Sequence, residues 1–133
     1  MNPAVNPPPL PEQNKIALLC VARDVGGIFI LTALGGFVIG LASRILASSG
    51  PPVILIGLSN ILLSVVGFVV AGCITRRNRW PHLVLVALGL WLVSAVNLAF
   101  GFSALQWVLS VFVIFAAMGL GGGIASAVAR GDA

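Results

Sequence analysis

Apolar residues form long uninterrupted stretches along this chain, and three of these stretches contain no Asp, Glu, Lys or Arg. They run between Asp24 and Arg44, over residues 45–75 and over residues 80–129. The strands of a membrane barrel alternate apolar and polar residues, so a barrel is excluded. A helix of about 20 mostly apolar residues crosses roughly 30 Å of hydrocarbon. The pattern therefore predicts transmembrane helices.

Two breaks divide these stretches into single crossings. Pro51 and Pro52 follow two serines and a glycine, and proline cannot continue a helix because it lacks the backbone N–H donor. The last stretch would reach roughly 75 Å as one helix, which is enough for two crossings. Its least apolar point is residues 100–103, where we place a turn. The predicted spans are about 25–46, 53–75, 82–100 and 104–129.

Composition supports the same fold class, an all-α integral membrane four-helix bundle. Charged residues make up 8% of the chain and apolar residues 59%, which leaves too little polar surface for a water-soluble fold. Prolines crowd the first residues, so we expect a disordered cytoplasmic tail over 1–14 and a transmembrane domain over 15–133. A helix at 12–24 either lies on the membrane or extends the first span.

The basic residues predict the orientation. Four crossings place both termini on one side, and cytoplasmic loops carry the excess of Lys and Arg. Six basic residues fall on the side of the termini and one on the other, which predicts N-in and C-in topology. Arginine-rich, lysine-poor composition favours a bacterial cytoplasmic membrane. Because these residues lie at helix ends, they indicate contact with lipid headgroups and not with nucleic acid. The six are Lys15, Arg23, Arg76, Arg77, Arg79 and Arg130, and the one is Arg44.

Small residues recur at helical spacing in the predicted spans. Helices associate in a bilayer by close packing over such residues, so these faces predict helix–helix contacts. We expect them to pack within the chain, with packing between chains as the alternative. The fourth span is small nearly all round, since it has a second face at Ala117, Gly121 and Ala125. The predicted packing residues are Gly36, Gly40, Gly57, Ser64, Gly67, Ala71, Gly119 and Gly123.

Polar residues gather in the outer half of the predicted bundle. One interpretation is a small pocket that binds a solute or an anion near Arg44. The other, which we favour, is interhelical hydrogen bonding among Asn60, Ser94 and Asn97, with Arg44 reaching the headgroups. The candidate cluster is Arg44, Asn60, Ser94, Asn97 and Gln106.

The ionisable residues near the cytoplasmic side predict no catalytic, cofactor or metal site. Arg23 and Asp24 are expected at the membrane boundary, within reach of headgroups and not as a buried pair. His82 follows Trp80 and Pro81 and is expected among the headgroups as well. Acid–base and nucleophilic catalysis need a positioned His, Cys or carboxylate, and these are scattered here. An enzyme is therefore not expected.

Two families of small transport proteins have the same four-helix layout, but this sequence lacks residues that are characteristic of each family. Small multidrug-resistance exporters use a membrane-embedded glutamate, whereas the only glutamate here is Glu12 in the tail. The segments 35–44 and 57–60 faintly resemble the first two elements of small fluoride channels, but the phenylalanine- and threonine-rich third element is missing. The sequence is assigned to neither family.

The functional hypothesis is therefore association. We expect a small non-enzymatic subunit or assembly partner whose partners are the lipid bilayer and another membrane protein or a second copy of itself. The alternative is a minimal oligomeric channel or transporter for a small solute or anion, which would use the outer polar cluster.

Overall fold

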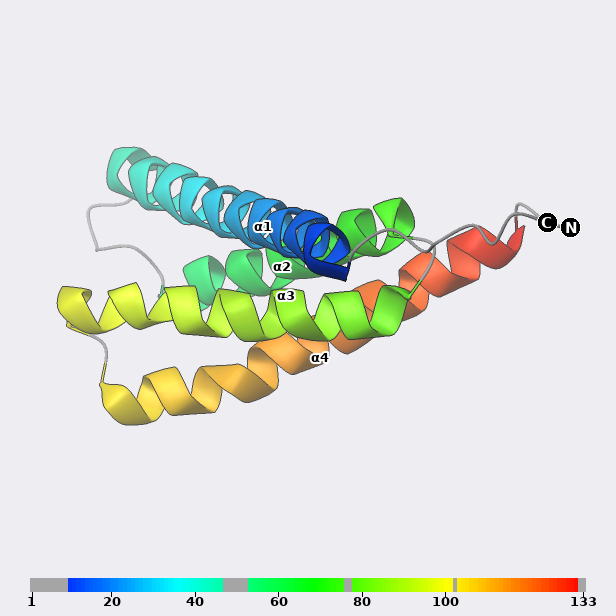
Figure 1. Cartoon of the computed structure of the whole chain (residues 1–133). Coiled ribbons are helices and arrows are strands. Elements are labelled where there is room, and N and C mark those ends of the chain that lie inside the picture. The colour runs from blue at the N-terminus through cyan, green and yellow to red at the C-terminus, as the bar shows by residue number, and fades with distance from the viewer. Residues whose placement is uncertain (1–9, 47–52, 76–77, 102, 132–133) are drawn as a thin grey trace, which may run out of the picture.

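Four helices make up the part of the chain that the computed structural model describes, residues 10–46, 53–75, 78–101 and 103–131. They are α1 (Leu10–Leu46), α2 (Val53–Ile74), α3 (Arg79–Val93), which continues as the 3-10 helix η1 (Ser94–Phe100), and α4 (Ala104–Gly131) (Figure 1). The segments long and apolar enough to cross a membrane are Leu18–Ile45, Ile54–Ile74, Arg79–Phe100 and Ala104–Arg130. The predicted all-helical fold with four candidate spans is confirmed, and it points to an integral membrane protein.

Helix α1 is continuous from Leu10, so the segment 12–24 extends the first span and does not form a separate helix. Residues 10–14 of the expected tail belong to this helix, while residues 1–9 lie outside the described residues. The expected break at 48–52 lies outside them too. The chain turns at Gly101, which has a left-handed backbone with φ of 93° and lies within the segment where a turn was expected.

The helices run antiparallel to their neighbours in sequence (Figure 1). Helix α1 packs against α2 and α3, and α4 packs against the same two helices, so α2 and α3 lie between α1 and α4. One end of the bundle holds Ile74, Arg79 and Arg130, and we call it the proximal end. The opposite, distal end holds Arg44 and Phe100. It corresponds to the side that the basic residues predict to face outward.

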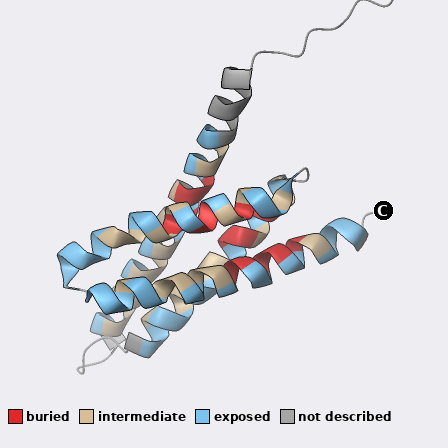
Figure 2. Cartoon of the chain, turned by 60° about the horizontal axis from the view of Figure 1, so that its bottom comes forward, coloured by how far each residue is buried: buried red, intermediate tan, exposed pale blue. Residues whose placement is uncertain are grey.

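The buried core occupies the proximal half alone. On α1 the buried residues end at Ile28, on α2 they begin at Gly67, on α3 they end at Leu90, and on α4 they begin at Ala117. We define the distal half as residues 32–45, 54–64 and 94–114, and none of its described residues is buried. Figure 2 shows this concentration of buried residues toward one part of the bundle.

Helices α2 and α4 come closest at Gly121. A Cβ added there would lie 2.6 Å from the Phe68 Cβ and 2.8 Å from the Val65 carbonyl oxygen. Phe68 is fully buried. A glycine is required at this position because any side chain would push the two backbones apart. This contact fixes α2 against α4 in the proximal half.

Helix α3 changes geometry beside a pair of tryptophans. The rings of Trp91 and Trp107 stack with centroids 4.4 Å apart. Each indole N–H donates to the backbone oxygen of the other residue at 3.1 Å. The hydroxyl of Ser94 donates to the same Trp91 oxygen at 2.6 Å. Side-chain donors to a helix carbonyl disturb the regular ladder, and the 3-10 helix η1 begins at Ser94.

Candidate functional site

A buried carboxylate joins α1 to α3 near the proximal end. The Asp24 Oδ2 atom lies 2.9 Å from the His82 Nε2 atom. The Asp24 Oδ1 atom accepts from the Arg23 Nε at 2.9 Å and lies 2.8 Å from the Arg23 Nη2. Both carboxylate oxygens therefore have a polar partner, as a buried carboxylate requires.

The structure corrects the expectation for these residues. The side chain of Arg23 is 58% exposed and can reach headgroups, but the side chains of Asp24 and His82 are only 6% and 11% exposed. The cause is the close approach of α1 to α3, where a Cβ at Gly89 would lie 2.8 Å from the Val25 Cγ2. Asp24 precedes Val25 and is carried inward with it. The available signal was that Asp24 is the acidic residue nearest a predicted span and His82 is the only histidine.

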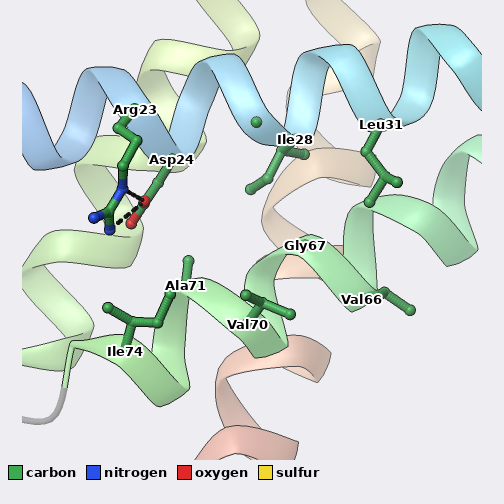
Figure 3. Close-up of a pocket in the computed structure, with 10 residues that line it drawn as sticks. Arg23, Asp24, Ile28, Leu31, Val66, Gly67, Val70, Ala71 and Ile74 are labelled. Carbon is green, nitrogen blue, oxygen red and sulfur yellow. Dashed lines mark hydrogen bonds and ion pairs between the residues drawn. The ribbon is translucent and has the colours of Figure 1, made fainter.

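A groove runs from this carboxylate between α1 and α2, with a volume of about 330 Å³. Arg23 and Asp24 lie together at one end, as Figure 3 shows. Everything else that lines the groove is glycine or apolar: Gly27, Ile28, Leu31, Val66, Gly67, Val70, Ala71 and Ile74. The groove thus has one charged end and an apolar body.

A second polar contact ties α3 to α4 at the same end. The Arg79 Nη1 donates to the Ser126 Oγ at 2.9 Å, and this hydroxyl donates to the Gly122 carbonyl oxygen at 2.8 Å. The Arg79 Nε is buried without a hydrogen-bond partner. The guanidinium of Arg79 is therefore hydrogen-bonded to α4. Arg23 is the more exposed of the two arginines, and it lies beside the groove.

The predicted outer polar cluster is divided between two cavities in the distal half. Ser94, Asn97 and Gln106 line a cavity of about 220 Å³ together with Trp107 and Ser110. Gln106 also caps α4, because its Oε1 accepts from the Ser103 backbone N–H at 3.0 Å while the Ser103 Oγ accepts from the Gln106 N–H at 3.2 Å. This reciprocal pair is a capping box. Local helix capping thus accounts for Gln106.

Asn60 lines the other cavity, of about 380 Å³, between α2 and α4. Its Oδ1 atom is buried, has no hydrogen-bond partner and lies 3.7 Å from the position of a Cβ on Gly36. The expected hydrogen bonds from Asn60 to Ser94 and Asn97 do not form between these described residues, since Ser94 donates within its own helix. Arg44 is exposed at the end of α1 and lines neither cavity.

Ser110 and Ile114 line both cavities, so the two adjoin along α4. The distal half therefore contains two adjoining cavities with hydroxyl and amide groups on their walls. Packing in the proximal half does not close it, because the buried part of α4 begins only at Ala117.

The predicted packing residues fall into two groups. Gly67 and Ala71 are buried, and Gly36 faces α2. Ser64 donates to the Asn60 carbonyl oxygen of its own helix at 2.7 Å. The others lie on open faces, where an added Cβ would meet nothing within 4 Å. These are Gly40, Gly57, Gly119 and Gly123.

On α4 it is the second small face that packs inside the chain. Ala117, Gly121 and Ala125 are buried there, as is Gly122, whose added Cβ would lie 3.0 Å from the Leu83 Cδ1.

Within the described ranges, no group of three or more His, Cys, Asp or Glu residues is arranged to hold a metal ion. The chain matches no protein-family model, no curated protein and no solved structure.

Proposed function

We propose that this protein is a small non-enzymatic multi-pass protein of a bacterial inner membrane, which acts by associating with another transmembrane segment as a subunit or assembly partner. The observation that supports the proposal is the loose packing of the distal half. None of its described residues is buried, although it contains an amide oxygen, Asn60 Oδ1, that lacks a donor.

Association would supply what this half lacks. Transmembrane helices are held together by close packing and by interhelical hydrogen bonds. A partner that filled the cavity between α2 and α4 would cover Ser64 and Ser110. Such a partner would extend the packing of the bundle beyond Ala117.

The open small face of α4 is where a partner backbone can approach most closely. Its residues are exposed, while the opposite face of the same helix packs against α2 and α3. The face consists of Ala116, Gly119, Gly123 and Ala127.

Native mass spectrometry of the tagged protein, extracted gently from the membranes of its own host, tests the association. We expect a companion protein in fixed stoichiometry. Gly123→Leu should remove most of the companion, because leucine would hold a partner backbone away while meeting nothing inside the chain. Gly26→Leu is the matched control, since Gly26 is also free of contacts but lies on α1. A lone homo-oligomer, or equal loss in both variants, would contradict the subunit proposal.

The orientation is part of this proposal. The proximal end carries Arg23, Arg79 and Arg130, whereas Arg44 is at the distal end, and the excess of positive charge favours the cytoplasmic side. We therefore infer that both termini are cytoplasmic and that the distal half faces outward.

The second candidate is transport, and the two adjoining cavities of the distal half are the observation that favours it. Asn60→Leu and Asn97→Leu separate the candidates. A transport protein should lose at least about tenfold in solute flux while it still folds. For association, we expect Asn60→Leu to leave folding unchanged or to stabilise it slightly, because its oxygen has no donor to lose. Purified variants in liposomes, with unfolding midpoints measured in parallel, give both readouts.

A further inference from the structure

We propose that the groove between α1 and α2 binds one anionic phospholipid, with its phosphate at Arg23 and one acyl chain along the apolar walls. The inference does not depend on the associating partner. It rests on three features of the proximal end: the depth of Arg23, the exposed donors of its guanidinium and the shape of the groove.

The depth of Arg23 matches the headgroup layer. It lies about 22 residues before Ile45, the end of the candidate span, which corresponds to roughly 33 Å of helix. The hydrocarbon layer is about 30 Å thick. When Ile45 lies at one boundary, Arg23 lies at the other, at the level of the lipid phosphates. The groove continues from there into the hydrocarbon along Gly27 and Leu31.

The accessible donor at the mouth of the groove is the Arg23 guanidinium, whose charge is paired with that of Asp24. Both oxygens of Asp24 are occupied, by Arg23 and by His82, so this carboxylate has no vacant side for a cationic ligand. Asp24 engages the Nε and Nη2 atoms of Arg23, whereas the Nη1 atom makes no hydrogen bond with the described residues, and the side chain is 58% exposed. The carboxylate thus orients a guanidinium whose remaining donors suit a phosphate. Asp24 and His82 are positioning residues.

The groove body suits an acyl chain. Gly27 and Gly67 lack side chains on facing helices, and the other walls are aliphatic. Because lipid tails are as apolar as these walls, the chain itself gives little selectivity. The headgroup contact must provide the preference for an anionic lipid.

Native mass spectrometry of the purified full chain tests the site, with dioleoyl-phosphatidylglycerol and dioleoyl-phosphatidylcholine supplied at equal concentration. We expect one retained phosphatidylglycerol per chain and a preference of about tenfold over phosphatidylcholine, because both lipids carry a phosphate but only phosphatidylcholine adds a positive choline group that Arg23 repels. Arg23→Gln should abolish this preference. Arg130→Gln should keep it, because Arg130 is exposed at the same end and lies outside the groove.

A second pair of variants tests the groove itself. Gly27→Leu fills it and should lower retention of both lipids about tenfold. Gly26→Leu should retain the wild-type value, since Gly26 is equally free of contacts but lies outside this groove. Equal retention of the two lipids by the wild type, an unchanged preference in Arg23→Gln, or equal effects of the two leucines would overturn the proposal. Displacement by an equal concentration of inorganic phosphate would also overturn it, because the site would then recognise free phosphate.

Discussion

Replacing Gly121 with leucine should lower the free energy of unfolding by about 3 kcal/mol, the upper range for overpacking a core. The new Cβ would meet the Phe68 Cβ at 2.6 Å and the Val65 carbonyl oxygen at 2.8 Å. Neither atom is the end of a flexible side chain, so α2 and α4 must separate. Unfolding of the purified protein in mixed micelles, by titration with dodecyl sulfate and far-ultraviolet circular dichroism, measures the loss.

The neighbouring glycine on the open face provides the control. Gly123→Leu makes the same chemical change two residues later, where an added Cβ meets nothing within 4 Å. Leucine has a higher helix propensity than glycine, so we expect equal or slightly greater stability. If the two variants had the same unfolding midpoint, the contact between α2 and α4 at Gly121 would be wrong.

This pair of glycines also shows how far the sequence could predict the fold. The existence of four spans follows from stretch length and missing charge, which the thickness of the bilayer dictates. The packed face of α4 does not follow, because that helix is small on both faces. The choice depends on Phe68, whose large side chain on α2 lies against Gly121. The spacing of small residues within α4 carries no information about a large residue on a different helix, such as Phe68 on α2.

The candidate site could be predicted less well, for a related reason. Asp24 and His82 are 58 residues apart, and they meet only because α1 crosses α3 where Val25 packs on Gly89. Each residue taken alone fits the membrane boundary. Their pairing depends on a crossing angle that no local pattern specifies.

The outer polar residues are brought together only in part, since Ser94, Asn97 and Gln106 line one cavity while Asn60 lines another. Ser94 donates to its own helix and Gln106 caps α4. Both interactions are local in sequence, and the Ser103-x-x-Gln106 spacing is a signal from which the cap could have been predicted. Asn60 lines another cavity, between α2 and α4.

The buried pair should be the other site of large mutational effects. His82→Leu leaves the Asp24 Oδ2 without its partner in a nearly inaccessible position. Leaving a buried acceptor without its hydrogen-bond partner typically costs about 1–3 kcal/mol, and more when the group is charged. We expect the free energy of unfolding to fall by about 3 kcal/mol in the same titration. Ser126→Ala, which removes the contact of Arg79 with α4, should cost about 1 kcal/mol and serves for comparison.

The double variant distinguishes an interacting pair from two independent packing positions. Asp24→Leu should also be destabilising, because it leaves His82 buried without an acceptor. Replacing both partners with apolar residues removes the unpaired group, so the double variant should be more stable than the sum of the single effects allows, with a coupling of about 2 kcal/mol. Strictly additive losses would mean that Asp24 and His82 do not interact. A coupling of this size would show that α1 and α3 are joined through the carboxylate, which is the arrangement that holds Arg23 at the mouth of the groove.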